Sequence, residues 1–188
     1  MSATNAAFGL RPVFHPSGLD RAQALANGIT SGYASDILKG APVKLTTAGV
    51  LNVLTSTESL QGAFDGVEWT DTTGRRRVSN YWPNGTTGTA IVAYYYNDPL
   101  IVYEIQADGS VAQTAIGDQA NFSNLTAGSN VTGLSQCTMA SSLAGAGNVG
   151  QLRIVDLAPY ADNAWGDAFT VVRVTISNHQ FVATINAI

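Results

Sequence analysis

Residues 81–110, YWPNGTTGTAIVAYYYNDPLIVYEIQADGS, decide the fold that this sequence predicts. Residues 90–96 are apolar on both faces of any strand they form, and an Asn-Asp-Pro stop follows them. Residues 100–106 resume the pattern with one apolar and one polar face, and end at an Asp-Gly turn. Such runs of β-branched and aromatic residues between turn signals favour consecutive antiparallel strands. A strand that is apolar on both faces is expected either at the centre of a sandwich or beneath another subunit.

The composition indicates a β-rich chain of low charge. The length of 188 residues favours a single domain, and a hydrophobic share of 45% argues against disorder. Charged residues make up only 12%, and the formal net charge of -4 argues against nucleic acid as a partner. No apolar run approaches the ~18 residues of a membrane span, and no signal peptide is visible. We therefore expect neither a nucleic-acid partner nor a membrane partner.

The same pattern of apolar runs and turn signals continues through residues 29–188, which we expect to form one β-rich body. No segment keeps a helical period of 3.6 residues. The prediction is an all-β fold, an antiparallel barrel or sandwich of roughly eight to ten strands. The segments expected to form strands are 29–33, 37–45, 50–54, 64–70, 75–81, 90–96, 100–106, 111–116, 121–125, 152–157 and 169–176. Residues 141–150 are expected to form a loop of small residues.

Residues 1–28 differ from the rest because glycine and proline separate their apolar side chains. No strand or helix period survives there, and the prolines bias the residues before them towards extended conformations. One interpretation is a frayed terminus. The other is an extended N-terminal arm that places its apolar side chains on another subunit. The apolar side chains in question are Phe8, Leu10, Val13 and Phe14.

No pattern in the sequence indicates catalysis, a cofactor or a metal site. The GAGNVG run at residues 145–150 matches a dinucleotide-binding pattern, but a β-rich run follows it where a helix N-terminus would be needed, so a surface loop is expected. His15 and His179 lie far apart and have no metal-ligand spacing. Cys137 is expected to be a buried small apolar residue. A nucleophile elbow is absent, and no carboxylate pair stands out, so we do not expect an enzyme.

Two further groups have both a structural and a functional interpretation. Residues 75–77 are three consecutive arginines in a predicted hairpin turn. They form either a solvated tip or a contact with an acidic neighbouring surface, where guanidinium groups pair with carboxylates. Four aromatic residues are expected to be core or interface anchors, and the alternative is a platform that stacks on sugars: Trp69, Tyr81, Trp82 and Trp165.

Four segments, in their order along nearly the whole chain, resemble virion proteins of tailed bacteriophages. These proteins accompany the major capsid protein as head decoration or cement proteins. The segments are NAAFGLRPVFHPSG (5–18), ILKGAPVKLTTAGVL (37–51), VSNYWPNGT with AIVAYYYNDPLIVYEIQADGS (78–86 and 90–110), and DNAWGDAF with VRVTISNHQ (162–169 and 172–180).

The resemblance implies a β-rich structural protein on the outer surface of the capsid in the virion. Its expected partners are the major capsid protein and its own copies, as a homotrimer, and no cofactor is expected. The alternative function is a glycan- or receptor-binding β module of a phage tail or fibre. The residues expected at a capsid or subunit interface are Phe8, Leu10, Arg11, Val13, Phe14, Arg75, Arg76, Arg77, Tyr94 and Tyr96.

Overall fold

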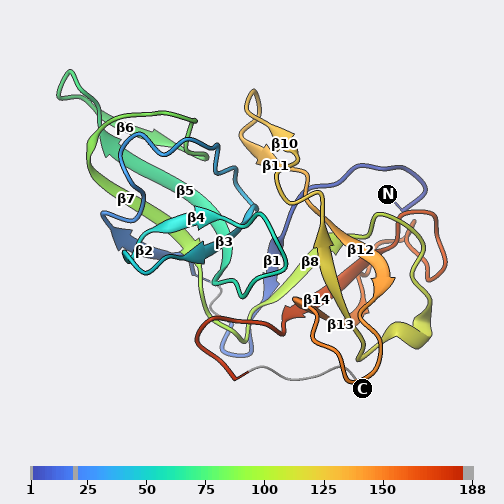
Figure 1. The fold of residues 1–188 in the computed structure, drawn as a ribbon. Helices are drawn as coiled ribbons and strands as arrows, with labels where there is room; N and C mark the ends of the chain where they lie inside the picture. The colour runs from blue at the N-terminus through green and yellow to red at the C-terminus, as the bar shows by residue number, and fades with distance from the viewer. Residues whose placement is uncertain (1, 19–20, 184–188) are drawn as a thin grey trace.

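The protein is all-β, with two six-stranded antiparallel sheets in a sandwich-like arrangement and no closed barrel (Figure 1). The computed structural model describes residues 2–18 and 21–183. Sheet A has the order β1 (Arg11–Phe14), β8 (Val102–Gln106), β14 (Val171–Ile176), β13 (Leu152–Leu157), β9 (Gln119–Ser123) and β12 (Thr138–Leu143). Sheet B has the order β2 (Gln23–Ala26), β7 (Thr89–Tyr96), β5 (Gly62–Thr70), β3 (Pro42–Leu45) and β4 (Leu51–Val53), and β6 (Arg76–Ser79) pairs with β5. A ribbon of β10 (Gly128–Ser129) and β11 (Leu134–Ser135) and a 3-10 turn, η1 (Gln113–Ala115), complete the elements among the described residues.

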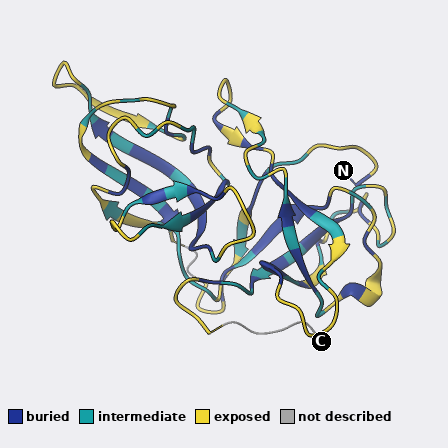
Figure 2. Cartoon of the chain, in the orientation of Figure 1, coloured by how far each residue is buried: buried dark blue, intermediate teal, exposed yellow. Residues whose placement is uncertain are grey.

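Each sheet has its own hydrophobic core (Figure 2). Tyr103 and Ile105 of β8 lie in the core of sheet A, whereas Phe64 and Trp69 of β5 lie in the core of sheet B. Trp82, in a loop, is fully buried against sheet B and meets Trp69 edge to face at 5.5 Å. The side chains that alternate along the strands therefore fill two separate cores, one for each sheet.

β7 and β8 were predicted as consecutive antiparallel strands, but they do not pair with each other. β7 lies between β2 and β5 in sheet B, and β8 lies between β1 and β14 in sheet A. Residues 97–101 cross from one sheet to the other because the apolar faces of the two strands enter different cores. β7 is a central strand, and its second apolar face, with Tyr94 and Tyr96, is half-buried.

Two strands of the N-terminal segment pair with strands of the body. β1 pairs with β8, β2 pairs with β7, and Leu10 is fully buried in the core of sheet A. Ser2 is also buried and donates a hydrogen bond to Asp167.

Gln106 of β8 holds part of the N-terminal segment by its backbone. The carboxamide of Gln106 accepts a hydrogen bond from the Ala6 N–H at 2.9 Å and donates one to the Thr4 carbonyl at 3.0 Å. A segment that a buried side chain holds by its backbone needs no hydrophobic period of its own.

Other predicted strands also differ from the observed ones, mostly at glycines and turns. Residues 29–33 form no strand, and residues 111–116 hold η1 instead of a strand. The strand expected over residues 37–45 shortens to β3, because Gly40 has φ +78° and the residues before it make only isolated bridges. Within residues 126–150, β10, β11 and β12 form where the pattern was loose.

Candidate interaction surface

Most of the predicted interface residues lie on one face of sheet B and in the cleft that continues from it. We call the face opposite the core the outer face; it carries Asp65, Glu68, Arg76, Val78, Tyr94 and Tyr96. Strand register places them together, because Glu68 pairs with Val78 on one side and with Val92 on the other. Residues opposite each other in an antiparallel pair point to the same face. Tyr94 and Tyr96 follow Val92 at intervals of two.

Arg76 is fixed by contacts within this face. Its guanidinium lies 3.0 Å from Glu68 Oε1 and donates to the Ala90 carbonyl at 2.7 Å, while the Tyr94 hydroxyl donates to Glu68 at 2.9 Å. The hydrogen bonds from Arg76 and Tyr94 lower the pKa of Glu68. Ala90 has φ +49° at a bulge where β7 places two residues opposite Trp69. Because a non-glycine residue is strained there, Arg76 has a structural role in holding the bulge.

At the hairpin tip before β6, Asp71 binds Arg77 and the backbone of Arg75, but not the side chain of Arg75. Asp71 accepts hydrogen bonds from the backbone N–H groups of Thr73 and Arg75 at 2.9 and 3.0 Å, and from Arg77 Nε at 2.7 Å. The hydroxyl of Thr73 and these other donors hold the pKa of Asp71 well below its usual range. Arg75 is exposed, and in the described part of the chain its side chain has no ion-pair partner. The predicted contact with an acidic neighbour therefore rests on Arg75 alone.

A cleft of about 350 Å³ lies between the two sheets, at the end of the outer face. Its floor includes the buried side chains of Leu10 and Phe64, and the half-exposed Leu134 of the ribbon lines it too. Four of the predicted interface residues line this one cleft: Phe8, Leu10, Arg11 and Tyr96. Clefts of this size and largely apolar lining, placed between packed units, are common binding sites.

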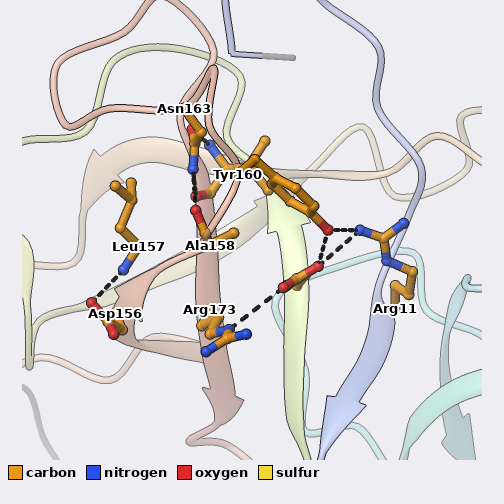
Figure 3. Close-up of polar contacts among 9 residues, drawn as sticks. Arg11, Asp156, Leu157, Ala158, Tyr160, Asn163 and Arg173 are labelled. Carbon is orange, nitrogen blue, oxygen red and sulfur yellow. Dashed lines mark hydrogen bonds and ion pairs between the residues drawn. The ribbon is translucent and has the colours of Figure 1, made fainter.

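The charges around the cleft are paired within the protein, and Figure 3 shows the polar contacts of Arg11 with its neighbours. Lys39 Nζ lies 2.7 Å from Asp65, and an Arg11 guanidinium nitrogen lies 2.8 Å from Glu104. The Tyr160 hydroxyl donates to Glu104 and accepts from Arg11. Since each cation already has a carboxylate partner, the cleft does not select a charged small ligand. Its apolar lining suits apolar side chains better.

Glu104 is the buried carboxylate of this group. Its side chain is nearly inaccessible, and the Nε of Arg173 approaches it at 3.5 Å from the neighbouring strand. Burial by itself raises the pKa of Glu104, but hydrogen bonds from Tyr160 and Arg11 outweigh burial and leave that pKa below its usual value. The same burial and the bond to Glu104 raise the pKa of Tyr160. Glu104 is therefore the anion around which β1, β8 and β14 are joined.

The remaining predicted interface residues lie elsewhere. Val13 and Phe14 are in β1, where Phe14 pairs with Val102 and is 55% exposed. Neither residue is part of the cleft lining or of the outer face. Phe14 is a separate exposed apolar side chain near the crossing of the chain between the sheets.

Three alternative sites from the sequence can now be compared with the packing. Trp69 and Trp82 are buried, so they offer no platform for sugar stacking, and Trp165 packs against the core of sheet A. Residues 145–149 are exposed and β13 follows them, which confirms a surface loop. Cys137 is buried as predicted, and burial raises its pKa to about 11.

Within residues 2–18 and 21–183, no three His, Cys, Asp or Glu side chains are grouped so that they could hold a metal ion. The described chain also has no helix of the length and apolar character that crossing a membrane requires. Comparison with known proteins gave no matching family model, no matching curated protein and no matching solved structure.

Sequence reasoning missed the residues that organise this surface. Glu68 and Val78 could have been found from the predicted hairpin, because its turn places residues 76 and 78 opposite residues 70 and 68. The approach of Lys39 and Asp65, and that of Glu104 and Tyr160, spans long distances along the chain. No local pattern signals such pairs.

Proposed function

We propose that this chain is a structural virion protein, a head decoration or cement protein that binds the outer surface of a tailed-phage capsid. The observation that carries the proposal is the continuous strip from the exposed Val78, past Tyr94 and Tyr96, into the apolar cleft. Tyrosine and arginine are enriched where proteins meet, and their neighbours exclude water from the contact. The four segments that resemble decoration proteins support the same function.

A cement protein needs a broad contact surface and not a reaction centre. It stabilises a shell by mass action, because it binds the assembled lattice and not the free subunits. The paired charges of the outer face, Arg76 with Glu68 and Lys39 with Asp65, suit such a contact because little unpaired charge is buried when it forms. The proposed partners are the major capsid protein and two further copies of this chain in a homotrimer.

The test is to add the protein back to purified heads that lack it, and to determine occupancy by electron-microscopic reconstruction. Val78→Lys places an ammonium group where a 78% exposed apolar side chain would dock, so we expect occupancy to fall. Val155→Lys makes the same chemical change at an exposed position in β13 of sheet A and is the matched control. It should occupy heads as the wild type does.

Where the copies lie separates this proposal from the alternative function. Copies distributed over the head support a cement protein. A few copies at the tail alone would support a glycan- or receptor-binding module and contradict our proposal. Full occupancy by the Val78→Lys variant would show that the outer face is not the contact surface.

A further inference from the structure

Residues 177–183, which we call the strap, connect the two sheets after the last strand. The strap leaves β14 of sheet A and runs beside Leu60, just before β5 of sheet B begins (Figure 1). The Leu60 N–H donates to the Asn178 carbonyl at 3.1 Å, and the Gln180 N–H donates to the Leu60 carbonyl at 2.9 Å. The strap therefore pairs with the segment that leads from β4 into β5 of sheet B.

The side chain of Gln180 extends this contact to β3. Its Oε1 accepts from the Leu45 N–H at 2.7 Å, and its Nε2 donates to the Leu45 carbonyl at 2.9 Å. One carboxamide thus satisfies both backbone groups of a strand residue, as a neighbouring strand would. A chain segment anchored in sheet A is in this way bonded to sheet B.

His179 lies at the centre of the strap and must be neutral to make its contacts. Its Nε2 lies 3.1 Å from the Asn97 carbonyl, and the Phe181 N–H donates to its Nδ1 at 3.1 Å. Because Nδ1 accepts, the single proton of the neutral ring belongs on Nε2, an assignment that follows from the partners. A second proton would sit on Nδ1 and face the N–H of Phe181, so protonation removes one bond and sets two donors against each other.

Burial opposes a charge on His179 and outweighs the neighbouring groups that favour one. The side chain is 2% exposed, and burial lowers its pKa, while the carbonyls of Gln61 and Asn97 act in the other direction. Asp98 is the charged group that favours protonation of His179, but its Oδ2 lies 3.1 Å from His15 Nε2 and so serves the other histidine. The strap itself carries no acidic or basic residue except His179.

Gln61 shows where water would enter once the strap opens. It is fully buried directly after Leu60, and in the described structure neither its carboxamide nitrogen nor its oxygen has a hydrogen-bond partner. Burying an unpaired amide is unfavourable. Release of the strap would let water reach this group, so the unpaired amide favours the open state.

We propose that the strap is a proton-sensitive latch, in which neutral His179 fastens sheet A to sheet B and protonated His179 releases residues 177–183 from Asn97, Leu60 and Leu45. Release frees the backbone of Leu45 at the end of β3 and loosens the crossing at residues 97–101. This inference concerns the fold and does not depend on the proposed capsid function.

The test is hydrogen exchange of the full chain at pH 7.5 and pH 5.0, with protection factors corrected for the intrinsic exchange rate at each pH. The amides of Leu60 and Gln180 should lose protection at pH 5.0, by up to about 30-fold, because a released histidine with the ordinary pKa of about 6.5 is protonated at that pH. His179→Gln keeps a neutral side chain with a donor and an acceptor, and should protect these amides equally at both pH values. His15→Gln is the matched control and should respond as the wild type does.

Two outcomes would overturn the latch. One is unchanged protection of Leu60 and Gln180 in the wild type at pH 5.0. The other is an equal loss of protection in His179→Gln, because the proton would then act elsewhere. If His179→Gln does not fold, nuclear magnetic resonance titration of the two wild-type imidazoles decides the question. The latch requires that one imidazole titrates at the same pH at which the Leu60 amide loses protection. If neither imidazole titrates at that pH, the proposal is refuted.

Discussion

Replacing Leu10 with alanine tests whether the N-terminal segment belongs to the core of the body. Leu10 is fully buried in the core of sheet A, although it lies among residues that resemble an extended arm in sequence. Large-to-small changes at such positions cost about 2–5 kcal/mol, because the lost contacts are only partly replaced by collapse. Leu10 also lines the cleft, into which neighbouring groups can relax, so we expect the lower half of that range, about 2–3 kcal/mol.

In a chain of this length, each kcal/mol lowers the melting temperature by about 2–4 °C. The Leu10→Ala protein should therefore melt about 4–12 °C below the wild type. Urea unfolding should show a lower midpoint with an unchanged slope. Phe14→Ala is the control, because Phe14 is 55% exposed on the same strand and its loss should change stability by less than about 1 kcal/mol. An unfolding curve for Leu10→Ala that matches the wild type would refute the placement of this segment in the core.

Three further predictions concern single groups. Arg75→Ser should leave thermal stability unchanged and weaken particle binding most at low salt. Arg76→Ser should lower the melting temperature measured by calorimetry, because Glu68 and the bulge at Ala90 lose their partner. The pKa of Glu104 is lowered in the folded protein, so its ionised form stabilises the fold. This contribution to the free energy of unfolding is fully present above the unfolded pKa of about 4.3 and is lost as pH falls through the folded pKa. Glu104→Gln should therefore weaken the pH dependence of stability on the acid side. Cys137 should not react with a thiol reagent at pH 8 until urea unfolds the chain, because its pKa of about 11 leaves roughly one thiol in a thousand ionised.

The strands that the sequence predicted well are runs of β-branched and aromatic residues between turn signals. Residues 152–157 were predicted as a strand and form β13 with the same bounds, and residues 64–70, 75–81 and 90–96 lie over β5, β6 and β7. The pattern of apolar side chains along a strand shows which face is buried, and this is a local property of the sequence. It does not report which core the face enters, so the crossing at residues 97–101 could not be foreseen.

The candidate surface was predicted only as a set of residue types. Phe8, Arg11 and Tyr96 do line one cleft, but their meeting depends on the pairing of β1 with β8 and on the crossing between sheets. The arginine triplet was identified, yet the sequence could not show that Asp71 and Glu68 engage two of its members. These contacts depend on strand register, which the hairpin turn fixes and which composition does not reveal.

The pairing of β1 with β8 implies an order of assembly. Phe14 and Val102 are register partners, so the whole of sheet B is built from the chain that runs between two neighbouring strands of sheet A. Bringing such distant residues together costs loop-closure entropy when the intervening chain is unfolded. Once residues 23–96 have folded, that cost is largely removed, because sheet B holds the two ends of its own segment close to each other. During synthesis from the N-terminus, all strands of sheet B are made before β8. Sheet B can therefore fold while β1 of sheet A still has no strand to pair with.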